Sequence, residues 1–81
     1  MKETYENISI KLKGLRAEKG YSHEEMAEKL GVHRETFRKY ENAPNTMEVG
    51  TFLKILNIYG VSAIYFFDLI YGKLPTSKEE T

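Results

Sequence analysis

The sequence predicts an all-α domain of five short helices, and three observations carry this prediction. Apolar residues recur at helical spacing in successive segments. Gly and Pro residues lie between these segments, where turns are expected. No segment alternates polar and apolar residues for long enough to indicate a β-strand. The chain has 81 residues, which is enough for one small domain.

The first two helices have the strongest local signals. Ile8, Leu12 and Leu15 form an apolar stripe and predict a helix over residues 5–18, which Gly20 closes. The second helix starts after a capping box, because a Ser is followed three residues later by a Glu that can bond back to it. The residues concerned are Ser22 and Glu25 for the capping box, Met26, Ala27 and Leu30 for the inner face, and Gly31 for the end.

Three more helices follow at short intervals. The third is expected from about His33 to Tyr40, before a turn marked by Pro44. The fourth is expected over residues 48–59, and the fifth begins after Ser62, which is a favourable N-cap residue. Their expected core residues are Phe37 and Tyr40 in the third helix and Phe52, Ile55, Leu56 and Tyr59 in the fourth.

Charge and composition narrow the class of protein. Twelve Lys and Arg balance twelve Asp and Glu, so the formal net charge is zero. Residues 1–40 carry nine basic and seven acidic residues, so an anionic partner is expected on this half. The absence of Cys excludes disulfides and thiolate zinc sites. We interpret residues 1–72 as the folded domain and residues 73–81 as a flexible polar tail or the start of a linker.

The second and third helices are joined by a very short connection. Residues 22–41 read SHEEMAEKLGVHRETFRKYE, so two short helices meet at Leu30-Gly31-Val32. This connection forces a steep crossing, which is the helix-turn-helix geometry. Phe37 and Tyr40 anchor the third helix to the core, so its other face is left to charged residues.

These residues resemble the lambda-repressor-like helix-turn-helix family, the DNA-binding domain of Cro and phage repressors. The matching stretches are LKGLRAEKGYSHEEMAEKLGVHRETFRKYEN and FLKILNIYGVSAIYFF, within residues 8–67. The resemblance implies a compact five-helix domain that binds double-stranded operator DNA as a two-fold dimer, with the third helix in the major groove. The positions that read bases or phosphates in the family, or flank those that do, are His23, His33, Arg34, Glu35, Thr36, Arg38 and Lys39.

Each of these residues also has a plain surface interpretation. Arg34 is expected to contact a base or phosphate, and the alternative is a solvated Arg. Glu35 could accept from cytosine, but we favour an i, i+4 pair with Lys39. Arg38 and Lys39 are expected to contact phosphates. His23 stands where the family often uses Gln against a phosphate, and its alternative is an exposed His without a role.

Other positions depart from the family or imply structural roles. The resemblance implies an ion pair between Arg16 and Glu41. His33 replaces the usual Ser or Thr cap of the third helix and is a poorer N-cap. Gly50 falls in the first turn of the fourth helix, so we expect that helix to start late or flexibly.

The last helix is apolar almost all round, which raises the question of a protein partner. Six of the ten aromatic residues lie within residues 52–71. A domain this small cannot bury every face of the last helix. We therefore expect the exposed part of this helix to form a homodimer interface. The alternative is contact with another protein or a further C-terminal region. The interface residues expected are Ile64, Tyr65, Phe67, Leu69, Ile70 and Tyr71.

Enzymatic and membrane functions find no support in the residue inventory. His23 and His33 have Ala27 and Phe37 at i+4, so neither forms a same-face metal-binding pair. No nucleophile motif or Gly-rich phosphate loop occurs, so no catalytic residue, cofactor or metal is expected. The longest apolar run has five residues, far short of the roughly 20 that span a bilayer. We therefore expect a cytoplasmic protein.

The sequence thus favours a sequence-specific regulator of transcription, of bacterial or phage type, that binds double-stranded DNA, and we expect it to be a repressor. The competing interpretation is a protein-interaction module, similar to an antitoxin or anti-repressor, that uses the aromatic C-terminal face. Three glutamates of the second helix keep this alternative open, because they would repel DNA: Glu24, Glu25 and Glu28.

Overall fold

The computed structural model describes residues 2–72 and shows an all-α fold there, as the sequence predicts. No strand occurs within this range. The expected polar tail, residues 73–81, lies outside the described residues. The elements in chain order are α1 (Lys2–Lys19), α2 (His23–Leu30), α3 (Arg34–Asn42), the 3-10 turn η1 (Pro44–Thr46), α4 (Val49–Tyr59) and α5 (Ala63–Tyr71).

Local capping accounts for where α2 and α5 begin. Ser22 Oγ accepts a hydrogen bond from the Glu25 amide at 3.0 Å, and Glu25 Oε1 accepts from the Ser22 amide at 2.8 Å. The predicted capping box is therefore confirmed. Ser62 Oγ likewise accepts from the Tyr65 amide at 3.1 Å and caps α5.

Several helix boundaries differ from expectation, and α1 is longer at both ends than the expected residues 5–18. The third helix continues two residues beyond Tyr40, to Asn42, because Glu41 and Asn42 keep helical geometry before the turn at Pro44. The fourth helix begins at Val49, so the expected late start caused by Gly50 was wrong. Its N-cap, Glu48, provides no side-chain hydrogen bond, so packing of the later apolar residues compensates for the weak start.

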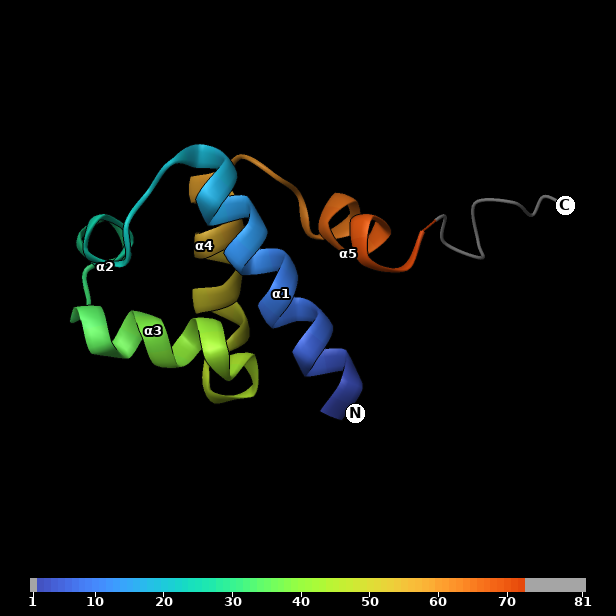
Figure 1. The fold of residues 1–81 in the computed structure, drawn as a ribbon, viewed down its shortest axis with the longest axis horizontal. Helices are drawn as coiled ribbons and strands as arrows, with labels where there is room; N and C mark the ends of the chain where they lie inside the picture. The colour runs from blue at the N-terminus through green and yellow to red at the C-terminus, as the bar shows by residue number, and fades with distance from the viewer. Residues whose placement is uncertain (1, 73–81) are drawn as a thin grey trace, which may run out of the picture.

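The five helices share one core at the centre of the domain. Figure 1 shows α1 crossing α4, with α2 and α3 toward one end of the molecule and α5 toward the other. α1 packs against α3, α4 and α5. The predicted apolar stripes of α1 and α2 enter the core, together with residues from the later helices. The buried apolar residues are Ile8, Leu12, Leu15, Met26, Ala27, Phe37, Ile55, Leu56, Tyr59 and Phe66.

The connection between α2 and α3 has the geometry that the short Leu-Gly-Val sequence predicts. Gly31 adopts a φ of 80°, a left-handed conformation that costs a glycine little. The amides of Gly31 and Val32 both donate to the Ala27 carbonyl, at 2.8 and 3.0 Å, and close the end of α2. The chain therefore turns into α3 within three residues.

The apolar composition of α4 and α5 invites comparison with a membrane span. Among the described residues, no single helix is long and apolar enough to cross a bilayer. Taken together, α4 and α5 are long and apolar enough, but the chain bends by 85° between them. Ile55, Leu56 and Phe66 of this pair lie in the core, which accounts for its apolar character.

Candidate nucleic-acid interface

The exposed face of α3 carries most of the predicted DNA-binding residues. Phe37 is 1% exposed and fixes the opposite face of the helix in the core. Because residues three and four apart share a helix face, the remaining charged residues point outward together. The exposed members are Arg34, Glu35, Arg38 and Lys39.

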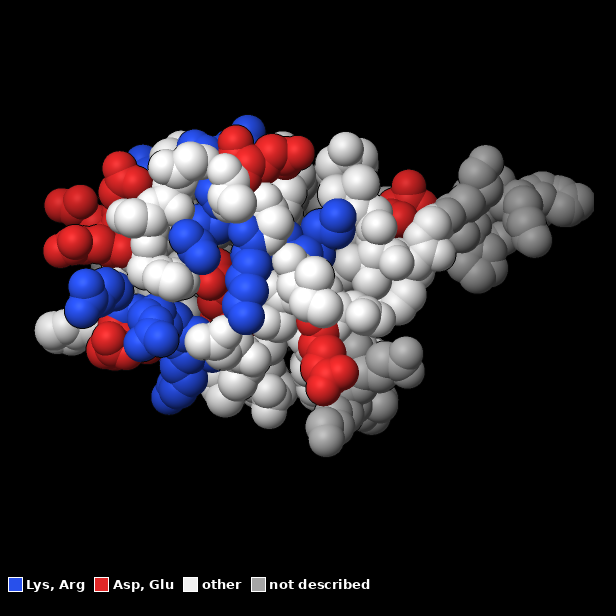
Figure 2. Space-filling view, in the orientation of Figure 1, with Lys and Arg blue, Asp and Glu red and all other residues white. Residues whose placement is uncertain are grey.

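Charge is distributed unequally between the two helices of the motif. Figure 2 shows Lys and Arg side chains over α3, and Asp and Glu side chains over the neighbouring α2. The acidic residues of α2 therefore border the cationic surface instead of interrupting it. This arrangement limits an anion-binding surface to α3 and the elements on its other side.

The expected pair of Glu35 with Lys39 was wrong. Arg38 Nη1 donates to Glu35 Oε1 at 2.8 Å, and Arg34 Nη2 lies 3.9 Å from Glu35 Oε2. The guanidinium at i+3 offers several donors in a fixed fork, so it captures the carboxylate that the single ammonium at i+4 was expected to take. Lys39 makes no ion pair within the described part of the chain.

His33 and Thr36 complete the start of α3. His33 is the exposed N-cap residue and makes no side-chain hydrogen bond to the helix, which agrees with its being a poorer cap. Thr36 is half-buried between the exposed face and the core. The first amides of α3 thus keep no side-chain cap, and free amides at a helix N-terminus favour anions.

A buried carboxylate joins the motif to α1. Arg16 Nε donates to Glu41 Oε2 at 2.9 Å, so the structure brings together the two residues of the implied ion pair. Arg16 Nη1 also donates to the Tyr21 carbonyl at 3.1 Å, which fixes the start of the loop before α2. Glu41 is only 1% exposed, so its charge depends on these partners.

His23 turns toward the same carboxylate. Its Nε2 lies 3.0 Å from Glu41 Oε1, and its ring centroid lies 6.0 Å from that of Phe37. Nε2 is therefore occupied within the protein, and Nδ1 can donate to a phosphate only when the ring carries a proton on both nitrogens. Sequence reasoning missed this contact because the two residues are separated by 18 positions and belong to different helices.

Tyr59 was expected only as a core residue, but the charges of Glu41 and Arg16 both affect the pKa of its hydroxyl. Its Oη is buried and has no hydrogen-bond partner among the described residues. Burial raises the pKa of Tyr59 well above its usual value, and the nearby charge of Glu41 raises it further. This environment could not be predicted from the sequence, because a Tyr within an apolar helical stripe is indistinguishable from an ordinary core residue.

The expected dimer face on α5 divides into two groups. Ile64 is 70% exposed, whereas Phe67 and Ile70 are half-buried against the core. The Phe67 ring lies 6.0 Å from Phe52 and so helps to attach α5 to α4. The exposed members of the expected face are Ile64, Tyr65, Leu69 and Tyr71.

Comparison with known proteins identifies similar chains. A helix-turn-helix family model matches residues 12–66. YonR, an uncharacterized HTH-type transcriptional regulator derived from the SPbeta prophage of Bacillus subtilis strain 168, is 42% identical over 52 residues, or 64% of this chain and 48% of YonR. ImmR, an HTH-type transcriptional regulator of the same strain, is 35% identical over 73 residues, or 90% of this chain and 54% of ImmR. The chain spans about half the length of these relatives. No solved structure matches it significantly.

Proposed function

Because the chain belongs to the lambda-repressor-like helix-turn-helix family, we propose that it is a sequence-specific DNA-binding transcriptional regulator. The observation that supports this most directly is the outward cationic face of α3 beside a well-anchored α2. Arg34, Arg38 and Lys39 are exposed, while Phe37 and Glu41 hold the same helix in place. A helix fixed on one side and cationic on the other suits the major groove.

The roles proposed for the α3 side chains differ. Arg34, in the first turn, reads a base edge, preferably guanine, whose O6 and N7 match a guanidinium fork. Arg38 and Lys39 contact phosphates, which positions the helix without specifying a sequence. Glu35 holds Arg38 in the free protein, so DNA competes with this exposed carboxylate for the guanidinium. Thr36 and His33 lie beside these contacts, and the imidazolium form of His23, which has a proton on Nδ1 as well as on Nε2, adds a phosphate contact.

We further propose that two copies bind a two-fold operator, with their α3 helices about one helical turn of DNA apart. The exposed apolar residues of α5 support this arrangement, because a contiguous apolar surface favours a partner. Such a dimer would act in the cytoplasm as a repressor where its operator overlaps a promoter. The same residues also support the second candidate function, a protein-interaction module that holds a different protein through α5.

Fluorescence anisotropy with duplexes from the DNA flanking the gene tests the proposal. We expect saturable binding to one two-fold site, weakening steeply between about 50 and 200 mM salt. Arg34→Ala should weaken binding and relax one base preference, by about 1–3 kcal/mol of discrimination. Arg38→Ala should weaken binding to all sequences alike.

Lys54→Ala, an exposed Lys on α4, is the matched control and should leave binding unchanged. Equal affinity of the unmodified protein for every flanking duplex and for random DNA would contradict the regulator function. In that case the α5 surface and the interaction-module function would become the better explanation.

A further inference from the structure

We infer that this protein takes up a proton at His23 when it binds DNA, so that its affinity for DNA falls as the pH rises. This inference rests on the proposed function and adds to it a mode of regulation by pH. It is carried by the contact of His23 Nε2 with Glu41 Oε1 at 3.0 Å, which commits one ring nitrogen to the protein. The other nitrogen, Nδ1, is left for a partner outside the protein.

The carboxylate of Glu41 decides which nitrogen of the neutral ring carries the proton. Arg16 Nε donates to Glu41 Oε2 at 2.9 Å, so the carboxylate is paired as an anion and its other oxygen can only accept. The neutral ring of His23 must therefore carry its single proton on Nε2 in order to donate to Glu41. Its Nδ1 is then a lone pair, which can only accept a hydrogen bond and repels a phosphate oxygen.

Packing holds the ring in this orientation. The ring centroid of His23 lies 6.0 Å from that of Phe37, with the two planes tilted by 54°, and Phe37 is buried in the core. Turning the ring would take Nε2 away from Glu41 and deprive a buried carboxylate of that partner. The His23 side chain is nevertheless 33% exposed, so a phosphate of the duplex can approach it.

A second proton reverses the behaviour of Nδ1. In the imidazolium both nitrogens donate, so Nε2 keeps its bond to Glu41 while Nδ1 donates to a phosphate oxygen. A hydrogen bond between a charged donor and a charged acceptor is also stronger than a neutral one. DNA therefore binds the protonated ring of His23 more tightly than the neutral ring, and binding draws a proton from solution. An imidazolium ordinarily loses this proton between about pH 5 and 8.

Two other ionisable groups beside this pair do not titrate in that range. α1 contributes Arg16, whose guanidinium stays charged. α4 contributes the hydroxyl of Tyr59, whose pKa is raised by burial and raised further by the charge of Glu41. Both groups keep their protons between about pH 5 and 8, so of these three side chains only His23 changes its charge there.

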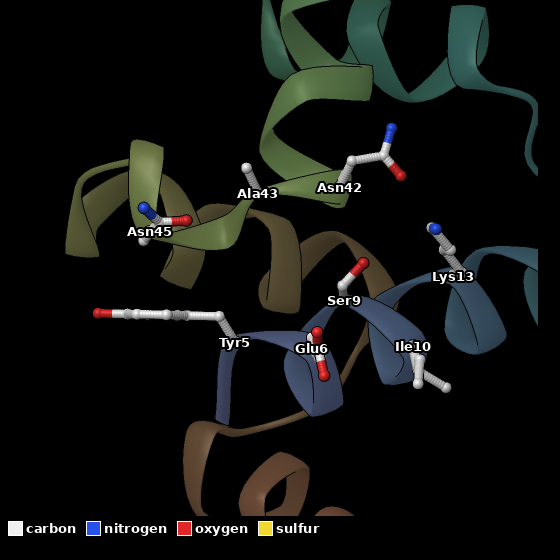
Figure 3. Close-up of a pocket in the computed structure, with 8 residues that line it drawn as sticks. All are labelled: Tyr5, Glu6, Ser9, Ile10, Lys13, Asn42, Ala43 and Asn45. Atoms are coloured by element: carbon white, nitrogen blue, oxygen red, sulfur yellow. The ribbon is translucent and has the colours of Figure 1, made fainter. Parts of the chain in front are cut away.

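The other acidic side chains of α1 and α2 have different surroundings. On α2, Glu25 accepts from a backbone amide in the capping box, and Glu24 is exposed. On α1, Glu6 lines a cleft of about 610 Å³ beside the end of α3, together with Lys13 (Figure 3). None of the ion pairs in the described part of the chain joins these carboxylates to His23. Glu41 is thus the carboxylate that sets the tautomer of the ring.

Fluorescence anisotropy at constant salt, from about pH 5.5 to 8.5, tests the inference on the flanking duplex that binds best. The affinity of the unmodified protein should fall about ten-fold across this range, the effect of one hydrogen bond to a charged group. His23→Gln should remove the pH dependence, because a carboxamide donates at every pH. His33→Gln is the matched control: it removes the other histidine, whose side chain does not cap α3, and should keep the pH dependence.

Calorimetry keeps the inference falsifiable even if His23→Gln does not fold. Titrations of the unmodified protein with DNA, in buffers of different ionisation enthalpy, measure the protons taken up on binding, and we expect up to about one. If the affinity is independent of pH and no proton is taken up, the inference is wrong and the proposed function stands. The inference is also wrong if His23→Gln, shown to be folded by circular dichroism, keeps the full pH dependence. If the unmodified protein binds no DNA at any pH, the inference and the proposed function both fail.

Discussion

His23 Nε2 lies 3.0 Å from Oε1 of Glu41, so the first residue of α2 meets a buried carboxylate of α3. Arg16 of α1 occupies the other oxygen of that carboxylate. Three helices therefore meet at one negative charge, and this charge fixes α2 against α3. The orientation of the cationic face of α3 depends on that arrangement. A helix of only nine residues is held in place mainly by its contacts with neighbouring helices.

Removing Arg16 should destabilise the fold strongly. Arg16→Met leaves Glu41 buried with His23 as its remaining side-chain partner, and breaking a buried pair in this way costs about 3–5 kcal/mol. The double variant Arg16→Met/Glu41→Leu removes both charges and should recover most of that loss. Urea denaturation measures the free energy of unfolding of each variant. Equal losses in the single and double variants would show that the pair is not the cause.

The unpaired hydroxyl of Tyr59 predicts an unusual response to high pH. Because burial and Glu41 raise its pKa, the folded state holds the phenol proton at a pH where the unfolded chain has released it. Stability is therefore unaffected by this group below about pH 10 and falls above it, by up to about 1.4 kcal/mol per pH unit. Tyr59→Phe removes the group, so the difference in free energy of unfolding between the two proteins should change only above that pH.

Near neutral pH, Tyr59→Phe should leave stability unchanged or raise it by about 1 kcal/mol, since the lost hydroxyl has no partner among the described residues. Thermal denaturation at pH 7 checks this value. A loss of stability there would mean that the hydroxyl makes a hydrogen bond, for example through a bound water.

The exposed residues of α5 predict how self-association responds to charge. Ile64→Asp places a carboxylate in the proposed dimer face and should convert a dimer into a monomer in analytical ultracentrifugation. Leu53→Asp, which changes an exposed apolar residue of α4, is the matched control and should leave the dimer intact. Dissociation by Leu53→Asp alone would place the interface on α4.

The sequence by itself determined the helices and the inner faces of α1 and α2. The Ser22 capping box, the Gly31 turn and the stripe of Ile8, Leu12 and Leu15 all act between residues no more than about seven positions apart. Such local signals are readable because helix geometry alone decides which residues are neighbours. The family resemblance was readable for the same reason, since it consists of these signals at fixed spacing.

Only the tertiary structure decided how the polar and apolar side chains were partnered. The contacts of Glu41 with Arg16 and His23 join residues 25 and 18 positions apart, so their distances depend on how α1, α2 and α3 pack. Packing likewise buried part of Phe67 and left Ile64 exposed on the same apolar helix. A helix pattern shows which residues share a face, whereas the neighbour that meets each face is set by the whole core.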